Sequence, residues 1–134
     1  INLSPDKPRV FAEACRVLRN GGRLAVTDIV AVRELPEDAR IHTGAYCGCI
    51  SGAALIQDIE RMLKEAGFEE IAVLPREESR EFIKSWFPGS GVERYVRSAD
   101  IEARRSPSAP CCSPSATSPT KACLRPSSWP APAR

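Results

Sequence analysis

Two adjacent glycines, Gly21 and Gly22, constrain the fold more than any other feature, because they separate two segments with different periodicities. The segment before them places apolar residues three and four positions apart, as on one buried helix face: Val10, Phe11, Ala14, Val17 and Leu18. The segment after them, 23–30 (RLAVTDIV), is mostly apolar and predicts a strand covered on both faces. Glycine readily ends a helix. Helix, glycine turn and buried strand make half of a βαβ unit, so the sequence predicts an α/β fold.

The first helix is expected to begin at Ser4, Pro5 and Asp6. A serine hydroxyl can cap free N–H groups, proline suits the first helical position, and an acid is stabilised near the positive end of the helix dipole. Pro8 still falls in the first turn, where its missing N–H costs little. Because the chain opens at Ile1 directly before this helix, we expect it to begin at the end of a strand and to form the C-terminal half of a larger domain.

Further helices and strands alternate along the chain up to residue 103. The pattern predicts a helix at 52–65, a strand at 70–74, a helix at 77–86, a turn at 88–91 and a strand at 95–103. The sum is about three strands and three or four helices, which is fewer strands than a complete doubly wound sheet contains.

Residues 104–134 differ in composition from residues 1–103. The first 103 residues carry 14 Lys/Arg and 17 Asp/Glu, whereas the rest carry 5 basic residues and no acid. The same C-terminal segment holds 7 Pro, 7 Ser and 5 Ala but no Ile, Val or Phe, so it cannot bury enough apolar surface to offset chain entropy. We therefore expect a domain at 1–103 followed by a disordered Pro/Ser/Ala-rich tail at 104–134.

Several classes of protein are disfavoured. No run of about 18 apolar residues is present to span a membrane, and the first residues lack the basic and apolar regions of an export signal. The basic tail has no aromatic residue apart from Trp129, which gives nucleic-acid binding little support. The sequence contains neither GxGxxG nor GxxxxGK[ST] as a phosphate loop. We expect a cytoplasmic protein that binds neither a membrane nor nucleic acid.

Cys47 and Cys49, separated by one glycine, form a candidate thiol site. They fall in an expected loop before a helix start near Ser51, where a helix dipole would favour a thiolate, the form that attacks electrophiles and binds soft metals. A zinc site would need a second pair of ligands, and His42 is the only histidine, so no metal site is predicted. The alternative interpretation is that small residues fill a crowded loop and have no chemical role.

Other polar and thiol residues are open to more than one interpretation. Cys15 lies beside the apolar helix face and is expected to be buried. Cys111 and Cys112 are adjacent thiols that could chelate a soft centre, but they lie in the expected tail, where no role is the simpler interpretation. Asp28 lies toward the carboxyl end of the first strand, where α/β sheets place functional groups. It is either a site residue or an anchor for a loop.

Longer motifs resemble one family. The chain contains INLSPDKPRVFAEACRVLRNGGRLAVTDIVAVRELPEDAR, then YCGCISGA, MLKEAGFEEI and SREFIKSWFPGSGVERYVRSADIEA. Together these resemble the C-terminal part of the catalytic domain of arsenite methyltransferases, which are S-adenosylmethionine-dependent class I methyltransferases. Many small-molecule methyltransferases share the first of these segments, whereas CxCISGA and SREFIKxWxPGSGVExYV are more distinctive.

The resemblance implies the C-terminal half of a Rossmann-like class I methyltransferase sheet, within residues 1–103. Residues 1–3 would end the fourth strand, 23–30 would be the fifth, 70–74 the sixth and 95–103 the antiparallel seventh.

The resemblance also implies a chemistry. Family members hold trivalent arsenic with cysteine thiolates, and the matching residue here is Cys49, the implied catalytic and arsenic-binding residue, with Cys47 as a helper. S-adenosylmethionine would be the methyl donor, arsenite and a thiol reductant the partners, and the protein a monomer that serves arsenic detoxification. The cofactor loop and the other arsenic-binding cysteines of the family have no counterpart in these residues, which implies that this chain alone is inactive.

Two alternatives stay open. Another small-molecule class I methyltransferase would have a cofactor site, once its upstream chain is restored, but no paired cysteines. A non-enzymatic thiol protein would bind a soft metal or metalloid through Cys47 and Cys49, with Cys111 and Cys112 as further ligands, without turnover.

Overall fold

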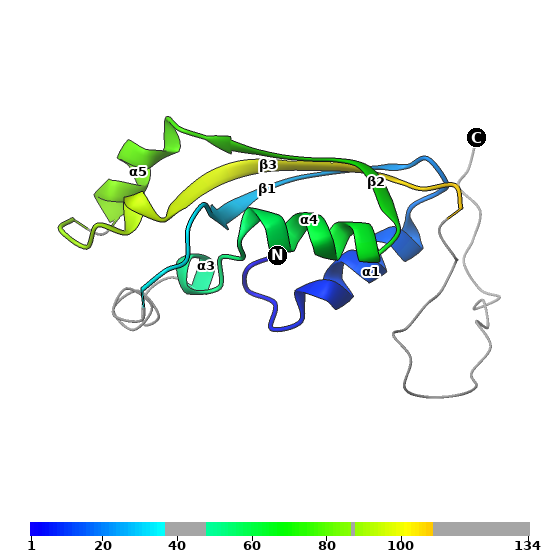
Figure 1. Cartoon of the computed structure of the whole chain (residues 1–134), viewed down its shortest axis with the longest axis horizontal. Helices are drawn as coiled ribbons and strands as arrows, with labels where there is room; N and C mark the ends of the chain where they lie inside the picture. Colours follow the sequence, from blue (N-terminus) through cyan, green and yellow to red (C-terminus); the bar gives the residue numbers. More distant parts are fainter. Residues whose placement is uncertain (37–47, 87, 109–134) are drawn as a thin grey trace, which may run out of the picture.

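The computed structural model describes residues 1–36, 48–86 and 88–108 (Figure 1). In chain order its elements are α1 (Lys7–Val17), β1 (Arg23–Ala31), α3 (Gly48–Ser51), α4 (Ile56–Glu65), β2 (Phe68–Arg76), α5 (Ser79–Trp86), the 3-10 helix η1 (Val92–Arg94) and β3 (Val96–Arg105). The three strands expected from the sequence are therefore present: β1 is one residue longer, β2 is two residues longer at each end, and β3 begins one residue later and ends two residues later than expected.

The strands form one sheet in the order β1-β3-β2, and β3 is antiparallel to both neighbours. Ile101 in β3 lies between Val26 of β1 and Val73 of β2. The last strand of the chain is thus the central one, and it runs antiparallel, as the resemblance implied. This arrangement is that of a class I methyltransferase sheet, of which these residues form one part.

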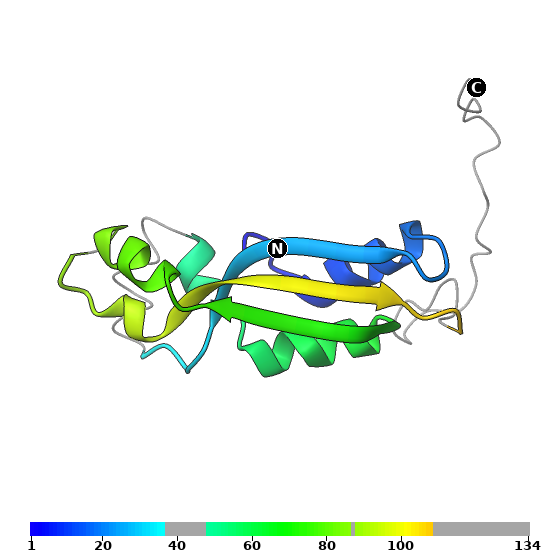
Figure 2. The ribbon, with the colours of Figure 1, turned by 90° about the horizontal axis from the view of Figure 1, so that it is seen from above.

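Helices α1 and α4 cover one face of the sheet, as the two views show together (Figures 1 and 2). The core between them is apolar and includes Phe11, Cys15, Val30, Ile59, Leu63, Phe68, Val73, Ala99, Ile101 and Ala103. Cys15 is buried there, as its place beside the helix face predicted. A second apolar cluster at the end of the sheet joins β1, α3, α5, η1 and β3 through Ala31, Leu35, Ile50, Ile83, Val92 and Val96.

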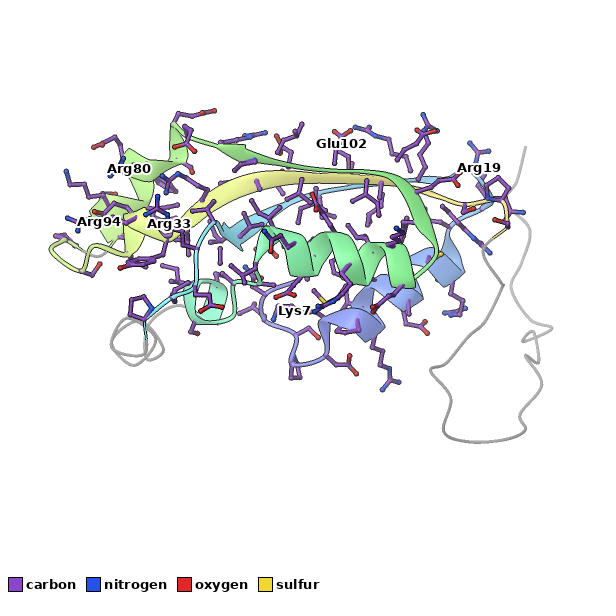
Figure 3. The ribbon with its side chains drawn as sticks, viewed as in Figure 1. Lys7, Arg19, Arg33, Arg80, Arg94 and Glu102 are labelled. Carbon is purple, nitrogen blue, oxygen red and sulfur yellow. The ribbon has the colours of Figure 1, made fainter. Side chains whose placement is uncertain are left out.

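The prediction that the first strand is covered on both faces is wrong. Arg23, Ala25 and Thr27 of β1 are exposed, because strand residues alternate between faces and the helices α1 and α4 lie on one face only. The open face carries ion pairs between strands, with N–O distances of 2.6 Å for Arg23–Glu102 and Arg76–Asp100 and 3.0 Å for Arg104–Glu70. Glu102 points away from the helices in Figure 3. Because the charged side chains on this face are solvated, the face can stay exposed to solvent.

Helix α1 begins later than predicted. Asp6, and not Ser4, is its N-cap: the Asp6 Oδ1 accepts a hydrogen bond of 3.0 Å from the Arg9 N–H. The Ser4 hydroxyl instead accepts from the Asp6 N–H at 3.3 Å, which makes a turn before the helix. Pro8 lies in the first turn, as expected. The helix ends at Val17, and the glycines form the following turn, in which Gly21 has a φ of 71°.

Helix α4 also begins later than predicted, at Ile56 rather than near Gly52. The backbone N–H of Ala31 donates to the Ala54 carbonyl at 2.9 Å, and Leu55 forms a parallel bridge with Ala31. This short extended pairing with the end of β1 competes with the helix, so residues 53–55 do not join it.

Residues 1–3 are not a strand in this structure, contrary to what the resemblance implied. Asn2 lies instead beside the C-terminal end of β1, held by side-chain hydrogen bonds. At the other end of the chain, β3 runs to Arg105, so the boundary expected after residue 103 falls inside a strand. The expected tail beyond residue 108 lies outside the described residues.

Candidate functional site

Cys49 lies in the one-turn helix α3, where the sequence predicted a loop. Its side chain is partly exposed, whereas the next residue, Ile50, is fully buried in the apolar cluster at the end of the sheet. The same turn thus presents a thiol near the surface and fixes its neighbour in the core. The helix contacts the C-terminal end of β1, the edge at which α/β sheets place their sites.

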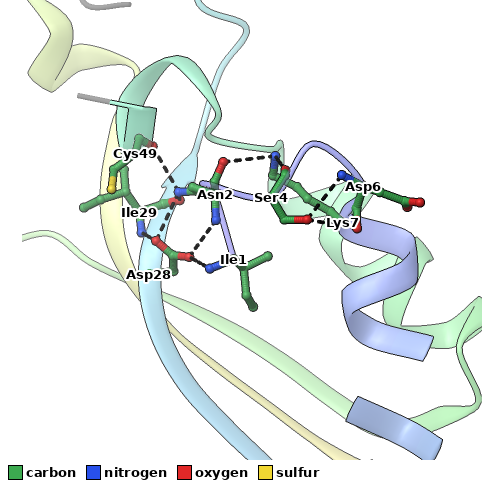
Figure 4. Close-up of polar contacts among 8 residues, drawn as sticks. All are labelled: Ile1, Asn2, Ser4, Asp6, Lys7, Asp28, Ile29 and Cys49. Carbon is green, nitrogen blue, oxygen red and sulfur yellow. Dashed lines mark hydrogen bonds and ion pairs between the residues drawn. The ribbon is translucent and has the colours of Figure 1, made fainter. Parts of the chain in front are cut away.

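The buried amide of Asn2 joins three segments at this point (Figure 4). Its Nδ2 lies 3.1 Å from Asp28 Oδ1, 2.5 Å from the Ile29 carbonyl oxygen and 3.0 Å from the Cys49 carbonyl oxygen. Only 7% of Asn2 is exposed. Sequence reasoning missed this residue, because a single asparagine before a helix looks like a turn residue and nothing in the spacing links it to Cys49.

The Asp28 carboxylate holds Asn2 in place. The sequence left open whether Asp28 is a site residue or an anchor for a loop, and the structure supports the anchor. Its Oδ2 accepts from the Asn2 backbone N–H at 3.1 Å and lies 2.8 Å from the amino group of Ile1, while its Oδ1 accepts from the Ile29 N–H at 2.8 Å. Burial raises the pKa of Asp28. Hydrogen bonds from the backbone N–H groups of Ile29 and Asn2 act in the opposite direction and lower this pKa.

Asp28→Asn is expected to lower the free energy of unfolding by about 1.5–3 kcal/mol at pH 7, the range for hydrogen bonds to a charged group. Urea denaturation of both proteins at pH 7 measures this difference. An unchanged free energy of unfolding would contradict this anchor role.

Several residues singled out from the sequence are not described by the structure. Cys47, His42, Cys111 and Cys112 all lie outside the described residues. Within the residues that the structure does describe, no group of three or more His, Cys, Asp or Glu side chains could hold a metal ion. No helix in the described part of the chain has the length and hydropathy to span a membrane.

Neither of two hollows among the described residues fits S-adenosylmethionine. The hollows, of about 190 and 150 Å³, lie on the open face of the sheet, and charged side chains line both, among them Arg23, Glu102 and Asp100. An adenosine group needs a mostly apolar wall with a few placed polar groups. A site for such a donor therefore needs residues other than those that line these two hollows.

Comparison with a protein-family model gives a match to a methyltransferase domain over residues 1–67, half of the chain. The arsenite methyltransferase of Halobacterium salinarum is 43% identical over 105 residues, which are 78% of this chain and 27% of that protein. The chain thus spans about a quarter of the length of this curated relative. A match of 105 residues within a chain of 134 necessarily includes Cys49.

Solved structures give a consistent result. An arsenic(III) S-adenosylmethionine methyltransferase from Chlamydomonas reinhardtii is 28% identical with a TM-score of 0.54, over 80% of this chain and 35% of that one. A phosphoethanolamine N-methyltransferase from Haemonchus contortus, solved with S-adenosyl-L-methionine, is 17% identical with a TM-score of 0.57, over 79% of this chain and 31% of that one. The second similarity is one of fold alone.

Proposed function

Because the chain belongs to the methyltransferase domain family, we propose that it is part of an enzyme that transfers a methyl group from S-adenosylmethionine to trivalent arsenic. The observation that carries this proposal is the 43% identity to an arsenite methyltransferase over a stretch that includes Cys49. The partly exposed thiol at the C-terminal end of β1 supports it, because sites of α/β sheets lie at that edge.

In this proposal Cys49 is a thiolate ligand of the arsenic, and Cys47 helps it. Trivalent arsenic is a soft centre that takes three ligands in a pyramid and keeps a lone pair. Thiolates hold this acceptor, and S-adenosylmethionine, when bound, supplies an electrophilic methyl group. An attacking lone pair needs no general base, so the contribution of these residues is position and orientation, effects that can supply up to about 7–11 kcal/mol.

The 134 residues alone are proposed to be inactive, since one or two thiolates do not complete the arsenic site and neither hollow of the described residues fits the methyl donor. The complete enzyme would work in the cytoplasm as a monomer, with a thiol reductant, and would serve arsenic detoxification.

A chimera tests the proposal. Residues 1–105, which end with β3, replace the segment that they match in the Halobacterium salinarum enzyme, and methylarsenicals are measured with arsenite, S-adenosylmethionine and a thiol reductant present. We expect the chimera to methylate arsenite and Cys49→Ala to reduce kcat/KM for arsenite at least tenfold, equivalent to about 1.4 kcal/mol. Cys15→Ala, a substitution of a buried thiol in the core, is the matched control and should keep most of the activity.

Each other outcome favours another function. A chimera whose activity is equally insensitive to both substitutions would remove Cys49 from the site. A chimera that binds S-adenosylmethionine without methylating arsenite would favour another small-molecule methyltransferase. Tight arsenite binding by the 134-residue chain, with no turnover in the chimera, would favour a thiol protein that sequesters the metalloid.

A further inference from the structure

The position of Cys49 depends on contacts outside its own helix. Helix α3 has four residues, a single turn, and one turn of helix is not stable by itself. Its place must therefore come from what it packs against. Ile50 provides one such contact, as a fully buried side chain in the apolar cluster at the end of the sheet.

The second contact is polar and acts on Cys49 itself. The Asn2 Nδ2 lies 3.0 Å from the Cys49 carbonyl oxygen and 2.5 Å from the Ile29 carbonyl oxygen, so one amide ties the backbone of the thiol residue to the end of β1. Figure 4 shows the Cys49 carbonyl turned toward this amide. A buried apolar side chain sets how deep the turn sits, and a directional hydrogen bond sets how it is rotated.

The orientation of the Asn2 amide follows from its neighbours. The three atoms around Nδ2 are a carboxylate oxygen and two carbonyl oxygens, all of which accept hydrogen bonds. Only the nitrogen of the amide can face them. Asp28 also accepts the backbone N–H of Asn2, at 3.1 Å, so both ends of the residue are held by the same carboxylate.

We propose that Asn2 is a positioning residue for arsenic binding, which acts by holding the backbone of Cys49 against the end of β1. This inference rests on the proposed function, in which Cys49 is a thiolate ligand. The Cys49 thiolate would bind a pyramidal arsenic centre together with thiolates from other segments. A fixed Cys49 backbone favours this binding, because the thiolate is then already in position. Residues that orient metal ligands typically change affinity about 10–100-fold when they are removed, and the same geometry argument applies to a metalloid.

The test compares Asn2→Ala, Asn2→Ser and a matched control in the same chimera. Ser79→Ala is the control, because Ser79 is also buried and its hydroxyl bridges backbone groups, donating to the Arg76 carbonyl at 2.6 Å and accepting from the Ser98 N–H at 3.0 Å. We expect Asn2→Ala to raise KM for arsenite about tenfold with a smaller change in kcat. Asn2→Ser, which keeps one donor, should recover part of this loss, and Ser79→Ala should leave KM unchanged.

A second readout does not depend on turnover. Alkylation of the 134-residue chain by iodoacetamide, mapped by peptide mass spectrometry, gives the rate at Cys49 with buried Cys15 as the internal reference. We expect Asn2→Ala to change the Cys49 rate several-fold and Ser79→Ala to leave it as in the parent chain.

The outcomes separate the two proposals. One outcome is that Cys49→Ala alters the KM for arsenite, while Asn2→Ala behaves like the control Ser79→Ala in KM, in the rate of Cys49 alkylation and in the midpoint of thermal unfolding. The positioning role is then wrong and the proposed function stands. If Cys49→Ala leaves kcat/KM for arsenite unchanged, Cys49 is not an arsenic ligand, and the positioning role fails with it whatever Asn2 does. Should Asn2→Ala not fold, Asn2→Ser provides the same comparison, and an unchanged KM there overturns the positioning role.

Discussion

Leu63→Ala is expected to lower the free energy of unfolding by about 2–5 kcal/mol, the range for a leucine removed from a packed core. Leu63 of α4 is 0% exposed and packs in the core between helices α1 and α4 and the sheet. The substitution loses the transfer free energy of the removed methyl groups and leaves a cavity. Single domains of ordinary stability unfold at a cost of only about 5–15 kcal/mol, so this one change would remove a large part of the total.

Leu74→Ala is the matched control for this prediction. Leu74 lies in β2 and is 58% exposed, so its truncation should change the free energy of unfolding by less than about 0.5 kcal/mol. Urea denaturation followed by far-ultraviolet circular dichroism measures both variants, and Ile59→Val, expected to cost about 0.5–1.5 kcal/mol, gives a graded value if Leu63→Ala does not fold. Equal effects of the two leucine substitutions would show that α4 does not pack on the sheet as described.

Arg97→Met is expected to lower the free energy of unfolding by about 2–4 kcal/mol, although methionine fills similar space. The Arg97 side chain is 8% exposed, and its guanidinium donates to the Glu93 carbonyl at 2.5 Å and to the Val96 carbonyl at 2.8 Å. Removing the donors takes a partner from one buried and one partly buried carbonyl oxygen, at about 1–3 kcal/mol for a group left buried without a partner. The ion pair with Glu77, whose side chain is 75% exposed, contributes little to this total.

Arg104→Met on the same strand is the control. Arg104 is 51% exposed and its ion pair with Glu70 lies on the open face of the sheet, so its loss should cost less than about 1 kcal/mol. Chemical denaturation of both variants in low and high salt makes the comparison. A large and salt-sensitive loss for Arg97→Met would mean that the pair with Glu77, and not the backbone contacts, supplies the stability.

The elements of the fold could be predicted from the sequence where local pattern and tertiary structure agree. The apolar residues of α4 recur at helical spacing, the strand at 68–76 contains its expected segment, and the strand at 96–105 contains all of its expected segment except Tyr95. The exposed face of β1 could also have been predicted, because Arg23, Ala25 and Thr27 alternate with larger apolar residues. The antiparallel direction of β3 was predicted from the family resemblance alone, because the spacing of apolar residues along a strand does not indicate its direction.

The site was harder to predict, because its geometry depends on contacts between distant segments. Asn2 and Cys49 are 47 positions apart, and folding of the chain brings the Asn2 amide next to the Cys49 carbonyl. The delayed start of α4 has a similar cause, since Ala54 pairs with Ala31 and not with its own helix. The position of Asp28 at a strand end could be predicted from the sequence. Its role as an anchor for residues 1–3 became visible only from its hydrogen bonds in the structure.

The central place of β3 has a consequence for the order of events during synthesis. Strands β1 and β2 are not neighbours in the sheet, and among the three strands that the structure describes each pairs with β3, the last of them to leave the ribosome. Neither can form this pairing until residues 96–105 have emerged, so this part of the sheet cannot assemble one strand at a time behind the growing chain. Such dependence on distant pairing slows folding and leaves two strand edges open to other chains while translation continues.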